Sequence, residues 1–149
     1  MTGLVITLVI FAVGTAIGLV LRARDGSIRL TRPGSVRSSA AADLPAPVMR
    51  AIDPESRITL VQLSSAACAP CRQAHARLSA AAEHSPEVHH AAIDITERPD
   101  VGSALGVLRT PTTVAYDSTG TEVLRVTGVP DTDSLVHALR PHLSPATEP

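Results

Sequence analysis

Two cysteines separated by two residues are the part of this sequence that points most directly to chemistry. Cys68 and Cys71 are the only cysteines among the 149 residues, and thiols at this spacing are close enough to bridge. A thiol at the start of a helix has a lowered pKa, because the helix N-terminus stabilises the thiolate. The pair therefore predicts thiol-disulfide exchange, in which Cys68 attacks a disulfide and Cys71 resolves the mixed disulfide.

The residues around this pair predict a strand that runs directly into a helix. The segment 58–63, ITLVQL, is apolar and β-branched enough for a buried strand. Residues 71–84 repeat apolar side chains at helical spacing. Cys68 then falls at the N-cap, and Pro70 fits the first turn, where its missing N–H costs nothing. Cys71 is expected inside the helix, shielded from solvent.

The rest of the chain alternates between short apolar runs and helical patterns. Strands are expected at 88–95, 110–116 and 121–126, a short helical connection at 96–107 and a final helix at 131–143. Strands joined first by a helix and later by a hairpin predict an α/β fold, with a mixed central sheet and helices on its faces.

A long uncharged run precedes this domain. Residues 3–21 carry no charge, and as a helix they would span about 28 Å, close to the hydrocarbon thickness of a bilayer. We expect an uncleaved, single-pass transmembrane helix that places the protein in the cell membrane. No Arg or Lys precedes the run and five Arg lie within 22–42, which favours a domain on the cytoplasmic side. Export of the domain is the competing orientation.

Composition divides the remaining chain and excludes several functions. Residues 22–54, rich in Arg, Ser, Ala and Pro, predict a tether with room for one short strand, followed by a domain over 55–143 and a disordered tail at 144–149. All 13 cationic side chains are Arg, which excludes Schiff-base and P-loop lysine chemistry. The low aromatic content, 1%, argues against nucleic acid as a partner. The absence of Lys and the Ala and Arg bias are typical of a bacterial protein from a GC-rich genome.

The ordered set of motifs around the cysteines resembles the thioredoxin family. The matching segments are LVQLSSAACAPC at 60–71, AID at 92–94, RTPT at 109–112 and VTGV at 126–129. The resemblance covers about residues 55–143 and implies a thioredoxin-like, membrane-anchored thiol-disulfide oxidoreductase with a CAPC active site. It further implies client protein disulfides as substrates, a reductase or a small thiol as electron donor, and neither a separate cofactor nor a metal.

The same resemblance implies a client-binding surface beside the cysteines. In the family, the proline that matches Pro111 is cis and lies against the active site, so Thr110 and Pro111 would present their backbone to an extended client peptide. Ala69 and Pro70 would complete the surface between the two cysteines. Gly128 matches a glycine that lets backbone pack near this site.

Three positions depart from the family pattern. Thioredoxins usually carry Trp immediately before the first cysteine, where this chain has Ala67. Their buried carboxylate, which assists proton transfer from the resolving thiol, corresponds to Gln62, and an amide cannot act as a base. The lysine partner of that acid falls near His90. Either His90 takes over proton transfer or it is an ordinary surface or capped histidine.

Two other functions compete with redox exchange. Cys68, Cys71 and His75 form a C-x2-C-x3-H pattern that His89 or His90 would complete as a metal-binding module, although only two thiolates are available. Alternatively, a thioredoxin-like domain with vestigial cysteines would serve as a non-enzymatic adaptor on its membrane stalk.

Overall fold

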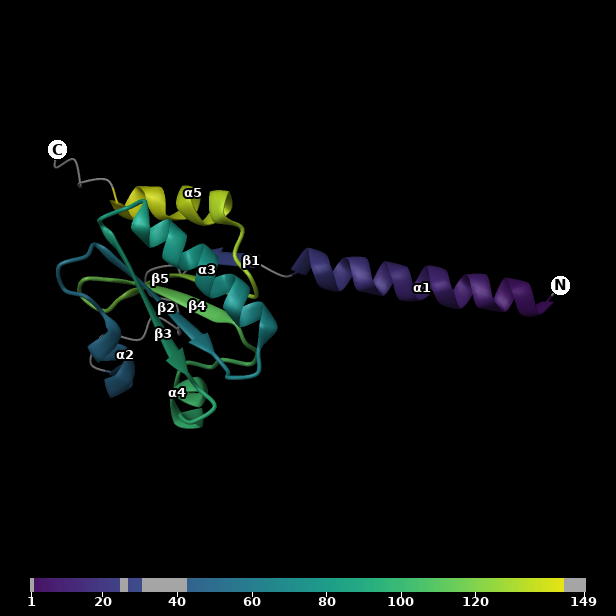
Figure 1. Ribbon diagram of the computed structural model, residues 1–149, viewed down its shortest axis with the longest axis horizontal. Helices are drawn as coiled ribbons and strands as arrows, with labels where there is room; N and C mark the ends of the chain where they lie inside the picture. Colours follow the sequence, from purple (N-terminus) through teal and green to yellow (C-terminus); the bar gives the residue numbers. More distant parts are fainter. Residues whose placement is uncertain (1, 25–26, 31–42, 144–149) are drawn as a thin grey trace.

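The computed structural model describes residues 2–24, 27–30 and 43–143, which form a long N-terminal helix and an α/β domain (Figure 1). The elements are α1 (Thr2–Arg24), β1 (Ser27–Leu30), α2 (Ala46–Ala51), β2 (Ile58–Ser64), α3 (Ala69–Glu83), β3 (Val88–Asp94), α4 (Pro99–Ala104), β4 (Thr112–Asp117), β5 (Glu122–Thr127) and α5 (Thr132–Leu143). The disordered tail expected at 144–149 lies outside the described residues.

One sheet runs through the domain in the order β1-β5-β4-β2-β3. The strand β2 pairs in parallel with β3 and antiparallel with β4, and β4 and β5 form an antiparallel pair. The parallel pair follows from the crossover through α3, whereas the short turn after Asp117 can only return the chain antiparallel. The predicted mixed sheet is confirmed.

Helices cover both faces of this sheet, so β2 is buried on both sides. Figure 1 shows α3 and α5 on one face and α2 and α4 on the other. Leu60 belongs to the core cluster that includes α3 and α5 residues, while its neighbours Val61 and Leu63 belong to the cluster on the opposite face. This double burial explains why β2 reads as a continuous apolar run rather than an alternating one.

The domain begins earlier in the chain than the sequence suggests. The composition of residues 22–54 predicts a tether, yet β1 and α2 both pack on the domain. Val48 of α2 is completely buried, Leu44 just before α2 is buried as well, and Ile28 of β1 packs against the core. A six-residue helix next to two prolines shows too little periodicity to stand out in the sequence, so only the short strand matches the prediction.

The helix α1 extends away from the domain (Figure 1). Its large apolar side chains between Val5 and Val20 are each more than half exposed. No helix within the described residues is long and apolar enough to cross a membrane. The transmembrane helix expected over 3–21 stays a prediction.

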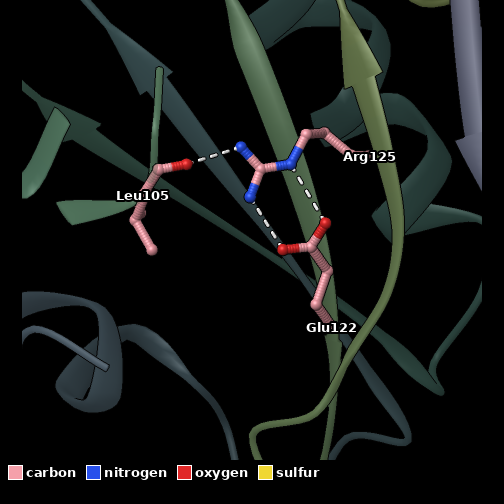
Figure 2. A network of polar contacts seen from close by, with 3 residues as sticks. All are labelled: Leu105, Glu122 and Arg125. Atoms are coloured by element: carbon pink, nitrogen blue, oxygen red, sulfur yellow. Dashed lines mark hydrogen bonds and ion pairs between the residues drawn. The ribbon is translucent and has the colours of Figure 1, made fainter. Parts of the chain in front are cut away.

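A buried ion pair ties the sheet to the loop that follows α4. Arg125 of β5 donates two hydrogen bonds to the Glu122 carboxylate, from Nε at 3.0 Å and from Nη2 at 2.7 Å. Its Nη1 donates to the Leu105 carbonyl oxygen at 2.8 Å. Figure 2 shows the guanidinium between these two partners. Arg125 thereby fixes the start of the segment 105–111, which leads to β4.

Candidate active site

The cysteine pair lies where β2 gives way to α3. Cys68 is the N-cap residue of α3, and its Sγ accepts a hydrogen bond from the Cys71 N–H at 3.1 Å. The two cysteines are disulfide-bonded, with their Cα atoms 5.2 Å apart. Cys71 is 4% exposed, whereas Cys68 is partly exposed. Only the first sulfur is thus open to a large partner, and the helix N-terminus stabilises the thiolate that reduction would produce there.

The loop before β4 lies against the cysteine turn. The Thr110–Pro111 peptide bond is cis, as the family resemblance implies. Thr110 Oγ1 lies 3.3 Å from Ser65 Oγ, and the Ser65 carbonyl oxygen accepts a hydrogen bond from the Cys68 N–H at 3.2 Å. Thr110 is therefore linked to the cysteine turn through Ser65, and the client-binding role that the resemblance implies for Thr110 and Pro111 stays a prediction.

The residue that follows β5 also contacts the loop before β4. The Gly128 N–H donates to the Pro111 carbonyl oxygen at 2.8 Å. Gly128 has a φ of 88°, a conformation that side chains with a Cβ rarely adopt. A glycine is therefore required for the end of β5 to support the proline loop.

Small side chains surround the accessible sulfur. Ala69 and Pro70 are exposed on the turn between the cysteines, and Ala67, at the position where the family usually has tryptophan, is exposed too. The large apolar side chain Leu108 is 97% exposed three residues before Pro111. The exposed side chains of the cysteine turn are thus small, and Leu108 is a large exposed apolar side chain in the loop that leads to Pro111.

A hydrogen-bonded chain of neutral side chains lies behind Cys71. Gln62 is 1% exposed, and its Nε2 donates to the Cys71 carbonyl oxygen at 2.8 Å. Its Oε1 lies 3.2 Å from His90 Nε2, and His90 Nδ1 lies 3.1 Å from Ser79 Oγ. The structure therefore brings together Gln62 and His90, the two positions that the sequence links to proton transfer.

The partners of Gln62 determine the tautomer of His90. An amide oxygen only accepts hydrogen bonds, so His90 Nε2 must carry the proton that is donated to Gln62. Nδ1 is then the basic nitrogen, and it accepts from the Ser79 hydroxyl. This basic nitrogen faces Ser79 rather than Cys71, and Gln62 contacts the Cys71 carbonyl rather than its sulfur. In this arrangement both side chains hold the backbone of Cys71 in place.

A polar hollow of about 220 Å³ opens beside the disulfide. Its walls come from the end of β2, the first turns of α3 and the end of β3, and they include Arg72, His75 and Asp94 as well as both cysteines. Water and small thiols can therefore approach the buried side of the cysteine pair.

Comparison with known proteins accounts for this arrangement. The family model for thioredoxin matches residues 47–141, more than half of the chain. The chain belongs to the thioredoxin family. It is 27% identical to a thioredoxin from Fasciola hepatica, over 60% of this chain and 84% of that one, with a TM-score of 0.52. A comparison with curated proteins finds no match.

Two further solved structures are similar to this chain. The thioredoxin NaTrxh from Nicotiana alata is 27% identical over 60% of this chain and 76% of its own, with a TM-score of 0.53. A mutant thioredoxin from Halobacterium salinarum is 23% identical, covers 69% of this chain and 89% of its own, and has a TM-score of 0.60. The latter supports the fold alone.

Sequence reasoning missed part of the chain of neutral side chains in this thioredoxin-family protein. Ser79 does not stand out in the sequence, and His75 enters there only as a metal ligand. The spacing contains the signal, because Cys71, His75 and Ser79 follow one another at intervals of four and therefore share one face of a helix. The rings of His75 and His90 lie 4.9 Å apart. The imidazole of His90 thus packs against α3 and is only partly exposed.

The competing metal-binding interpretation receives no support from the geometry. His89 and His90 are neighbours on β3, so their side chains point to opposite faces of the sheet. Within residues 2–24, 27–30 and 43–143, no three His, Cys, Asp or Glu side chains are grouped to hold a metal ion. Both thiols, moreover, are engaged in the disulfide.

The enclosed His90 should make stability depend on pH. Burial, followed by repulsion from His75 and His89, lowers its pKa from 6.5 to about 4. The unfolded chain therefore takes up a proton near pH 6.5 while the folded chain stays neutral, so stability is full above pH 6.5 and decreases as the pH falls towards 4. The urea midpoint should fall more steeply over this interval for the wild type than for His90→Gln.

An exposed histidine provides the control for this titration. His137 lies on the exposed side of α5, and His137→Gln should retain the wild-type dependence of the urea midpoint on pH. Identical slopes for the wild type and His90→Gln would contradict the burial of a neutral imidazole.

Proposed function

We propose that this protein reduces disulfides in client proteins, with Cys68 as the attacking thiol and Cys71 as the resolving thiol. The observation that carries the proposal is the position of Cys68, which caps α3 with an accessible sulfur, bridges to Cys71 and adjoins the Thr110–Pro111 loop. Family membership independently supports thiol-disulfide exchange at this pair. No other nucleophilic pair is needed for the reaction.

The reaction proceeds through two displacements. In the reduced protein, the Cys68 thiolate attacks one sulfur of the client disulfide, and the other client sulfur leaves as a thiolate that takes up a proton. Cys71 then loses its proton and attacks Cys68 Sγ, which releases the second client thiol and forms the Cys68–Cys71 disulfide. Two electrons from a reductase or from two small thiols restore the dithiol.

Reduction of insulin by dithiothreitol tests this proposal. The wild-type protein should accelerate the precipitation of reduced insulin chains well above the rate with dithiothreitol alone. A rate equal to that background would instead favour the adaptor interpretation, in which the domain holds a partner without exchanging its disulfide.

Client recognition should depend on Leu108. A 97% exposed leucine beside the Thr110–Pro111 loop can bury part of its side chain against a bound peptide. Leu108→Asp should raise KM for a peptide disulfide about 3- to 10-fold, which corresponds to roughly 1 kcal/mol of lost apolar contact. Reduction of a small aromatic disulfide, which is too short to reach Leu108, should be unchanged.

An exposed apolar residue far from the disulfide supplies the matched control. Val136 on α5 is 40% exposed, and Val136→Asp should leave both KM values unchanged. If Leu108→Asp left the KM for the peptide disulfide at the wild-type value, Leu108 would have no part in client binding.

We further propose that α1 anchors the protein in a membrane. Support comes from the uncharged run 3–21, from the helix that contains it, and from the exposure of the apolar side chains between Val5 and Val20. The hydroxyls of Thr7 and Thr15 bond to carbonyl oxygens four residues earlier, so they add no unsatisfied donors in an apolar medium. Resistance of the full chain to alkaline carbonate extraction would support the anchor, and complete release would refute it.

The excess of Arg after the run leads us to propose that the domain is on the cytoplasmic side. There the thiol pool would keep the protein mainly a reductant. A membrane-impermeant maleimide applied to intact cells should leave Cys68 unlabelled until lysis. Labelling before lysis would place the domain outside.

A further inference from the structure

The pairing of β1 determines which end of the domain lies next to α1. The strand β1 runs antiparallel to β5, with Ser27 opposite Thr127 and Leu30 opposite Leu124. The end of β1 that follows α1 therefore meets the end of β5 that leads to Gly128. Only two residues separate Arg24, the last residue of α1, from Ser27, so their Cα atoms are at most about 11 Å apart.

A series of contacts continues from this point to the disulfide. Gly128 follows Thr127 and donates its N–H to the Pro111 carbonyl oxygen at 2.8 Å. Thr110, next to Pro111, contacts the Ser65 hydroxyl through its Oγ1 at 3.3 Å. The Ser65 carbonyl oxygen in turn accepts a hydrogen bond from the Cys68 N–H. Figure 1 shows α1 leaving the domain on the side where β2 meets α3. These steps place Cys68 within roughly 40 Å of the end of α1.

We infer that the disulfide lies close to the membrane surface and that the clients are membrane proteins whose disulfides lie within about 40 Å of the bilayer. This inference rests on the proposed membrane attachment of α1. The pairing of β1 with β5 sets this short distance, because a free tether over residues 22–54 would reach about 110 Å when extended. The pairing of β1 in the sheet thus keeps the domain and its disulfide close to the membrane surface.

Packing holds β1 in this position. Ile28 pairs with Val126 and packs against the core cluster beneath α3 and α5. Ile28→Asp would place a charge against that core and is expected to detach β1, since an isolated charge is costly to bury. The attachment would then run freely from Arg24 to Leu44 and reach about 70 Å. Ile28→Val keeps an apolar β-branched residue and serves as the matched control.

Vesicles that contain the full chain and an anchored reporter test the inference. Each reporter carries one disulfide at the end of a helical spacer. The length of the spacer holds the disulfide about 20 Å from the bilayer in the near reporter and about 60 Å in the far reporter. The wild-type protein and Ile28→Val should reduce the near reporter at least tenfold faster than the far one. Ile28→Asp should bring the two rates to within about threefold.

Two measurements separate this inference from the function on which it rests. Insulin reduction in detergent should be equal for wild type and Ile28→Asp, and all three proteins should float with the vesicles. Equal reduction of near and far reporters by the wild type would overturn the inference and leave the proposed function intact. Loss of insulin reduction by the wild type would overturn the proposed function, and failure of the wild type to float would overturn the proposed membrane attachment; either outcome would overturn the inference as well.

Discussion

Cys68→Ser is expected to reduce the rate of insulin reduction to that of dithiothreitol alone, a loss of at least about 100-fold relative to the protein-dependent rate. The reason is that a serine hydroxyl cannot displace a sulfur from a disulfide under these conditions. Cys68 is the partly exposed member of the pair and caps α3, so no other sulfur in the chain can take its place.

Cys71→Ser should behave differently from Cys68→Ser, although it too should lose turnover. Its Cys68 thiolate can still attack the client, but the 4% exposed resolving position no longer carries a thiol. A mixed disulfide between Cys68 and the client should therefore accumulate and be visible on a non-reducing gel. Wild-type turnover in Cys71→Ser, or a trapped adduct with Cys68→Ser instead, would contradict the assigned roles.

Glu122→Gln should be the most destabilising single polar substitution that we consider, at about 3 kcal/mol in the free energy of unfolding. The side chains of Arg125 and Glu122 are 13% and 4% exposed. Burial opposes the charge on Arg125, but hydrogen bonds and attraction from Glu122 outweigh it and raise the pKa of Arg125. The amide in the variant would leave a buried guanidinium without its counter-charge.

An exposed ion pair in the same domain provides the comparison. Arg57 and Glu87 are 44% and 46% exposed, with Nε and Oε1 3.1 Å apart, so Glu87→Gln should cost less than about 1 kcal/mol. The double variant Glu122→Leu/Arg125→Met, with an apolar pair in place of the buried charges, should recover most of the lost stability. Urea denaturation that showed equal costs for Glu122→Gln and Glu87→Gln would refute this account.

The central strands and the cysteine turn could be predicted from sequence because their signals are local. The run from Ile58 is apolar on both faces, and Pro70 and the two cysteines mark the first turn of the following helix. The cis bond before Pro111 was available only through the family resemblance, since no local property distinguishes it from an ordinary trans proline.

Features that depend on contacts distant in sequence could not be predicted. The position of β1 at the β5 edge follows from pairing across about a hundred residues, and four residues carry no pattern that selects an edge. Arg125 reaches Leu105 through the fold alone. The sequence singles out His90, but the engagement of His90 with Ser79 depends on the packing of α3 over β3, which decides that its basic nitrogen points away from the cysteines.

The central claim is that the Cys68–Cys71 pair cycles between disulfide and dithiol in the folded protein. Mass spectrometry of the full chain, equilibrated in graded ratios of reduced to oxidised dithiothreitol and quenched with acid, tests it directly. The account predicts one reversible transition that adds two hydrogens and maps to the peptide containing both cysteines. A mass that stays constant across all ratios would contradict it.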